Sequence, residues 1–111
     1  MESRLIYKSN TTYLNKVTWD FVNKGSEWYF IGNENINEEK IIQIVNQTFL
    51  DNSLYIVLDR DDSHEIQKSE IIKKIVATLK DRDFSVWDNK FHKVIQFNKN
   101  GICRVGARVI S

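Results

Sequence analysis

The sequence predicts an α/β protein of the α+β type, with helices on one or both faces of a mixed β-sheet of about five or six strands. Segments with strand-like and helical patterns alternate from the N-terminus to about residue 80. Three strand-like segments, separated only by short turns, then follow one another. The expected order is therefore β-α-β-α-β-α-β-β-β, ending in an antiparallel meander.

The whole chain, residues 1–111, is expected to form a single domain. Its 111 residues suffice for one hydrophobic core, and the absence of proline with only four glycines leaves no segment of linker composition. The 41% hydrophobic and 28% charged residues are typical of a globular protein. Cys103 has no partner for a disulfide, and no apolar segment is long enough for a signal peptide or membrane span. We expect a cytoplasmic protein without membrane contact.

Two strands and one helix are expected in the first third of the chain. Residues 4–8 (RLIYK) are typical of a short strand, and residues 27–31 (EWYFI) are typical of a second one. Between them, apolar residues recur at helical spacing over residues 10–24. Gly25 stands where a helix often ends, so the expected helix spans residues 10–24.

Two further helices flank an apolar strand in the middle of the chain. Asn37 is a typical N-cap for the first of them. Residues 54–58 (LYIVL) form a continuous apolar run, as in a strand buried on both faces. Ser69 is the expected cap of the last helix, whose apolar stripe is Ile71, Ile72, Ile75, Val76 and Leu79.

The C-terminal meander is predicted by three segments of strand composition. These are residues 84–87 (FSVW), 90–97 (KFHKVIQF) and 102–110 (ICRVGARVI). The intervening sequence NKNG, residues 98–101, favours a hairpin because Asn and Gly tolerate positive φ.

The acidic stretch DRDDSHE directly follows the apolar run and is the first candidate site. Its carboxylates are those of Asp59, Asp61, Asp62 and Glu65, at the end of a buried strand where α/β sheets often bind ligands. Grouped carboxylates suit Mg²⁺ or Mn²⁺, so a small metal-dependent phosphodiesterase acting at the three aspartates is one interpretation. A protein-binding acidic surface is a second interpretation, and a solvated strand-to-helix loop is a third.

The spacing of these carboxylates weighs against metal catalysis. A nuclease pattern ending in Glu-x-Lys is not met, because Glu65 and Lys68 are one residue too far apart to share a strand face. Cys103 lies in an alternating strand pattern and is expected in the core, and no phosphate-binding or nucleophile motif is present. We therefore expect a non-enzymatic protein with no catalytic residue, no metal and no cofactor.

Positive charge gathers at the C-terminal end of the chain. Residues 89–111 carry five Lys and Arg and no Asp or Glu, within an overall net charge of +1. Arg104 and Arg108 alternate onto one strand face, and Lys93 shares it if the register allows. This basic hairpin is the alternative site, where nucleic acid would bind, but five charges are few for such a partner.

Trp28 and Phe30 are the aromatic candidates. They alternate with Tyr29, so both side chains lie on the same face of the predicted strand. If exposed, the pair is a candidate contact site for a protein, because aromatic anchors carry much of the energy of protein interfaces.

The chain resembles the small cytoplasmic immunity proteins that bacteria pair with secreted toxins. The resemblance is one of general type over the whole chain. It rests on a short, proline-free, Asn/Ile/Lys-rich domain, the acidic stretch DRDDSHE and the C-terminal hairpin FHKVIQFNKNGICRVG. It implies a protein without catalytic activity that binds one toxin domain, often a basic nuclease, and covers its active site. The expected partner-binding residues are Asp59, Asp61, Asp62, Glu65, Trp28 and Phe30, and the oligomeric state stays open.

Overall fold

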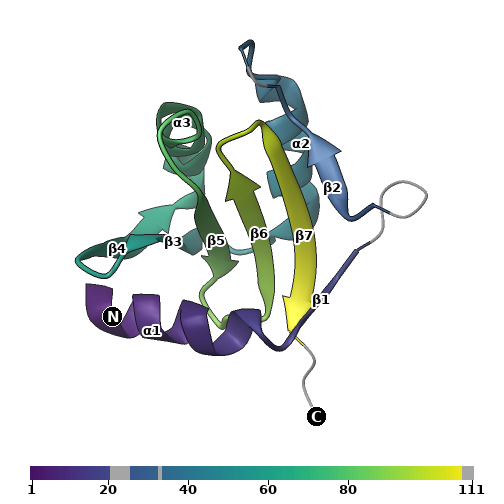
Figure 1. The fold of residues 1–111 in the computed structure, drawn as a ribbon. Helices are drawn as coiled ribbons and strands as arrows, with labels where there is room; N and C mark the ends of the chain where they lie inside the picture. Colours follow the sequence, from purple (N-terminus) through teal and green to yellow (C-terminus); the bar gives the residue numbers. More distant parts are fainter. Residues whose placement is uncertain (21–25, 33, 109–111) are drawn as a thin grey trace.

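The computed structural model describes residues 1–20, 26–32 and 34–108, which form three helices and seven strands (Figure 1). The helices are α1 (Ser3–Leu14), α2 (Glu38–Thr48) and α3 (Lys68–Thr78). The strands are β1 (Val17–Trp19), β2 (Trp28–Phe30), β3 (Ser53–Asp59), β4 (Asp62–Gln67), β5 (Phe84–Asp88), β6 (Lys93–Asn98) and β7 (Ile102–Arg108). The α+β class and the C-terminal meander of β5, β6 and β7 are confirmed.

All seven strands belong to one sheet in the order β1-β7-β6-β5-β3-β4, and β2 pairs with β7 beside β1. Every pairing among the described strands is antiparallel, whereas a mixed sheet was expected. The difference arises from β4, which sequence patterns assigned to a loop. Because β4 reverses the chain before α3, β5 returns antiparallel to β3, where a direct strand-helix-strand crossover would have made the pair parallel.

The N-terminal segment differs from the sequence expectation. The expected strand at 4–8 lies inside α1, and the expected helix at 10–24 ends at Leu14. After α1 the chain enters β1, within the range expected to be helical. Gly25, expected to follow the helix, lies outside the described residues.

The packing of α1 explains this difference. Ile6 is buried in the same cluster that Tyr13 packs against, seven residues or about two helical turns later. The helical period therefore extends toward the N-terminus. Val17 and Thr18 are β-branched and enter β1 instead, where such side chains fit a pleated surface.

The sheet separates two apolar clusters. α2 and α3 cover one face, where the central residues of the cluster are Ile41, Val45, Ile71, Ile75, Leu54, Ile56, Val86, Ile95 and Cys103. α1 covers part of the other face, over Tyr55, Val57, Trp87, Phe91 and Val94. β3 contributes to both clusters, which confirms that the apolar run at 54–58 is buried on both faces.

For the later helices and turns, local sequence signals predicted positions close to the observed ones. Asn37 Oδ1 accepts the Lys40 N–H at 3.1 Å, as expected of an N-cap. α3 begins at Lys68, before the expected cap Ser69, because β4 runs directly into it. Gly101 has φ of 89° in the β6–β7 turn. In the stripe of the last helix, Ile71, Ile75 and Leu79 are buried, whereas Ile72 and Val76 are partly exposed.

The two edges of the sheet lie on opposite sides of the molecule (Figure 1). β4 forms one edge, and the short strands β1 and β2 form the other. Five steps between neighbouring strands separate β4 from β2, which corresponds to about 24 Å at the usual strand spacing. None of the described helices has the length and apolar character needed to cross a membrane.

Candidate functional site

The acidic stretch forms the turn of a hairpin, and the expected strand-to-helix loop is wrong. β3 and β4 pair antiparallel, and the chain turns at Arg60 and Asp61 between Asp59 and Asp62. Glu65 lies further along β4, opposite a residue of β3. The structure therefore groups the three aspartates and sets Glu65 apart from them.

Arginines neutralise the aspartates at this turn. Arg82 Nη1 lies 3.3 Å from Asp59 Oδ2, and Arg4 Nε lies 3.3 Å from Asp61 Oδ1. Arg60 adds a third positive charge within the turn itself. The three aspartates and three arginines of the turn sum to a formal charge of zero, and Glu65 brings the whole stretch to −1. Most of the negative charge that the sequence shows is therefore balanced in the fold.

The turn is also fixed by hydrogen bonds. Asp59 Oδ1 accepts the Asp61 N–H at 3.1 Å, and the Ser63 hydroxyl donates to the Asp59 carbonyl oxygen at 2.6 Å. From α1, Ser3 Oγ accepts the Ser63 N–H at 2.8 Å. Asp59 thus serves to shape the hairpin. In the ranges that the structure describes, no group of three or more His, Cys, Asp or Glu is placed to hold a metal ion.

The other two acidic candidates have local partners. Asp62 Oδ1 lies 3.6 Å from His64 Nδ1. Glu65 Oε2 accepts a hydrogen bond from the Ser53 hydroxyl at 2.6 Å. Both carboxylates are exposed on β4, the edge strand, where charged side chains discourage pairing with another strand.

The basic hairpin places its charges on both faces of the sheet. Arg104 and Arg108 share one face, as expected, with Gly106 between them. Lys93 pairs with Ala107 and therefore lies on the opposite face, so its expected grouping with the arginines is wrong. The surface over Gly106 is also filled from β1, because a Cβ there would lie 2.4 Å from Val17 Cγ1. A phosphate backbone has no approach at this glycine.

Arg104 is held between two tryptophans. Its guanidinium carbon lies 3.8 Å from the centre of the Trp19 ring and 4.8 Å from that of Trp28. Arg104 Nη1 donates to Glu27 Oε1 at 3.0 Å, and Arg104 Nε donates to Gln96 Oε1 at 2.7 Å. Stacking and charge-assisted hydrogen bonds together fix this side chain before any partner binds.

Arg108 is engaged in a similar way. Its guanidinium carbon lies 4.1 Å from the centre of the Tyr13 ring of α1. Nε donates to the Phe91 carbonyl oxygen at 2.8 Å, and Nη2 to that of Lys90 at 3.4 Å. Both arginines of the alternative site therefore stabilise the fold of this face.

Trp28 and Phe30 lie on the same face as Arg104, as the alternation of β2 predicted. Trp28 is half-buried beneath the guanidinium, whereas Phe30 is 65% exposed. We call the surface formed by Trp19, Trp28, Phe30 and Arg104 the aromatic edge. It combines a fixed arginine with an accessible phenyl ring, on the opposite edge of the sheet from the acidic turn.

No protein-family model, curated protein or solved structure matches the chain. The aromatic edge has the composition of the centre of protein interfaces, in which Trp, Tyr, Phe and Arg are enriched. An arginine side chain that is held against two aromatic rings needs little further ordering on association. This surface is therefore suited to contact with another protein.

Sequence reasoning missed the contributions of Trp19 and Glu27. Trp19 was assigned to a helix, and only its pairing with Gly106 in β7 brings its ring over Arg104. The signal in the sequence is Gly106 itself. A glycine in the middle of a strand often marks a position where a large neighbouring side chain approaches closely.

Cys103 is buried on the opposite face of β7, which confirms its expected place in the core. Burial raises the pKa of its thiol to about 12, so the nucleophilic thiolate is scarce at neutral pH. The thiol therefore lacks the properties of a catalytic nucleophile.

Proposed function

We propose that this protein is a cytoplasmic protein-binding domain of the immunity or inhibitor type, which neutralises a bacterial toxin by covering its active site. The observation that carries this proposal is the aromatic edge, where Phe30 is exposed beside a fixed Arg104. Such a protein has no catalytic activity of its own, and its effect comes from the occupied surface of its partner.

The preorganised arginine supports the proposal energetically. Long side chains lose conformational entropy when they become ordered on binding, at about 0.5 to 1.5 kcal/mol each. Arg104 is already fixed by Trp19, Trp28 and Glu27 in the free protein. Phe30 then supplies an apolar anchor that a pocket on the partner removes from water.

The acidic turn has a smaller role in this proposal than its sequence implied. Because Arg4 and Arg82 pair with Asp61 and Asp59, the turn offers little net negative charge to a basic partner. Rim charges of this kind mainly alter association rates and specificity. We therefore assign the main binding energy to the aromatic edge.

Neither alternative function gains support from a particular feature. A phosphodiesterase acting through Asp59 would need a carboxylate that already binds Arg82 and the backbone of the turn. A nucleic-acid module would need Arg104 and Arg108, both of which are engaged within the protein.

The proposal is tested by identifying the partner and measuring protection. The chain is used to capture proteins from a lysate of its own cells, and the captured protein is then expressed in a susceptible host. We expect growth to stop when the partner is expressed alone and to recover when this chain is co-expressed. A captured partner that has no toxicity, or whose toxicity the chain does not relieve, contradicts the immunity function.

Two matched variants show, in the same assay, whether the aromatic edge is the surface that binds the partner. Phe30→Ala is expected to weaken protection while leaving the fold intact, because Phe30 is 65% exposed. Leu50→Ala is the control, since Leu50 is 87% exposed and lies outside the aromatic edge. Protection that survives Phe30→Ala and fails in Leu50→Ala would assign binding to another surface.

A further inference from the structure

A cavity of about 310 Å³ lies on the face of the sheet opposite the aromatic edge. Its floor is the small-residue stretch Val105, Gly106 and Ala107 of β7. One wall is the end of α2, where the helix stops at Thr48 and leaves this part of the sheet uncovered. The other described lining residues are Asp20, Tyr29, Ile44, Gln47 and Lys93.

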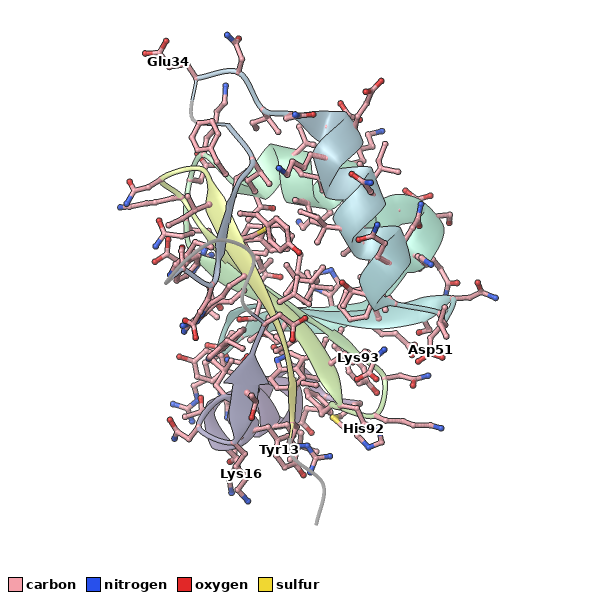
Figure 2. All side chains as sticks on the ribbon, turned by 90° about the vertical axis from the view of Figure 1, so that its right-hand side faces the viewer. Tyr13, Lys16, Glu34, Asp51, His92 and Lys93 are labelled. Atoms are coloured by element: carbon pink, nitrogen blue, oxygen red, sulfur yellow. The ribbon has the colours of Figure 1, made fainter. Side chains whose placement is uncertain are left out.

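Two opposite charges flank this cavity. Asp20 follows β1 and is held beside β7 by a hydrogen bond from its N–H to the Val105 carbonyl oxygen at 2.8 Å. Lys93 begins β6 on the other side of β7, opposite Ala107. It lies near His92 and Asp51 on the side of the molecule seen in Figure 2. Neither charge belongs to an ion pair of the described residues.

The geometry of the sheet sets the distance between the strands that position these residues. β1 and β6 are the two neighbours of β7, so their backbones are separated by two strand spacings, about 10 Å. Both residues line the cavity, and neither is within ion-pair distance of a described partner. A small molecule that carries a positive and a negative group can therefore contact both of them.

The remaining polar groups of the cavity can complete its contacts. Burial, together with the charge of Asp20 and the nearby Cys103, raises the pKa of the Tyr29 hydroxyl, which therefore stays protonated as a donor. The Gln47 amide supplies both a donor and an acceptor. Ile44 adds an apolar wall.

We propose that this cavity binds a small zwitterion of the amino-acid class, with its ammonium group toward Asp20, its carboxylate toward Lys93 and an apolar side chain against Ile44 and Val105. A volume of about 310 Å³ is at the small end of ligand cavities, which run from about 300 to 1,000 Å³. It suits a single amino acid better than a nucleotide. The cavity and the aromatic edge lie on opposite faces of β7, so loss of one function leaves the other measurable.

Calorimetric titration of the full chain tests the charge requirement. The probes are glycine, L-alanine, L-valine and L-leucine, with two analogues of valine that each lack one charge, 3-methylbutanoate and isobutylamine. We expect saturable binding of at least one amino acid, and at least 10-fold weaker binding of both valine analogues if valine binds. No binding of any amino acid up to 10 mM, or equal affinity for valine and 3-methylbutanoate, overturns the proposal.

Variants and amide shifts test the location. Lys93→Met and Asp20→Asn are each expected to weaken binding at least 10-fold, whereas Lys99→Met, an exposed lysine in the β6–β7 turn, leaves it unchanged. In nitrogen-15 spectra of the wild-type chain, the bound amino acid is expected to shift the amide signals of Gly106, Ala107 and Gln47. Shifts confined to other residues, or undiminished binding by folded Lys93→Met, overturn the site.

Discussion

The two edges of the sheet differ in how well the local sequence predicts the charges and side chains on their surface. The turn between β3 and β4 is the most acidic stretch of the chain, yet Arg4 and Arg82 come from distant segments and neutralise it. The opposite edge consists of two three-residue strands with ordinary hydrophobic composition. There the fold places Arg104 between Trp19 and Trp28. A cluster of like charges in a sequence therefore does not give the charge of the folded surface. Residues of opposite charge from distant parts of the chain can lie beside the cluster and balance it.

The energies at the two edges differ as well. The ion pair of Asp61 joins side chains that are 59% and 74% exposed, and exposed pairs contribute about 0 to 1 kcal/mol. The Arg104 side chain is only 24% exposed and its guanidinium lies over aromatic rings, where cation–π contacts reach about 2 kcal/mol. The aromatic edge is thus the more strongly organised of the two surfaces.

The largest effect is expected from Gly106→Ala. An added Cβ would lie 2.8 Å from Trp19 Cε3 and 2.9 Å from the Thr18 carbonyl oxygen, so β1 must move away from β7. Overpacking costs about 1 to 3 kcal/mol, and the backbone contact places this variant at the upper end. Urea unfolding measures the loss, with Arg60→Ala at the acidic turn as the unaffected control. A Gly106→Ala protein as stable as the wild type would show that β1 is not packed on β7.

Alkaline pH is expected to give the next largest loss of stability, through the buried thiol of Cys103. The folded-state pKa of Cys103, opposite Tyr29 of β2, is raised from 9.0 to about 12 by burial. Stability linked to this thiol is therefore complete below pH 9 and is lost as the pH rises toward 12. The expected loss is about 2 kcal/mol by about pH 10.5.

Urea unfolding as a function of pH measures this loss. Cys103→Ala is the control, because it removes the thiol and should flatten the decline above pH 9. An identical decline in wild type and Cys103→Ala would assign the effect to other groups.

The smallest effect is expected at the acidic turn. Asp61→Asn removes the exposed contact with Arg4 and should change the free energy of unfolding by less than about 1 kcal/mol. The difference should shrink further in 1 M salt, because salt screens exposed charges. A loss above about 2 kcal/mol would show that the turn is a stabilising network after all.

Sequence patterns predicted the parts of the fold that depend on neighbouring residues. Asn37 as a cap, the apolar run of β3 and the NKNG turn at Gly101 each carry their structural cause within a few positions. β4 lacks this kind of signal. Its sequence DSHEIQ buries Ser63 and exposes Glu65, so its pairing with β3 and its contact with α1 decide its conformation.

The candidate site was predictable only in part. The shared face of Trp28 and Phe30 follows from strand alternation and is confirmed. The neutralising role of Arg4 and the stacking of Trp19 on Arg104 depend on contacts across 57 and 85 positions of the sequence, which local spacing does not encode. Lys93 was placed on the wrong face because the hairpin register was not determined by sequence.

The affinity of the captured partner for three versions of the chain tests most directly which edge binds. The measurement is a calorimetric titration of wild type, Phe30→Ala and the Asp61→Lys, Asp62→Lys double variant. We expect Phe30→Ala to lose about 2 kcal/mol, or about 30-fold in Kd. The double variant should lose less than about 10-fold, mainly through slower association at low salt. Binding unchanged in Phe30→Ala, beside a loss above about 30-fold in the double variant, would move the interface to the acidic turn.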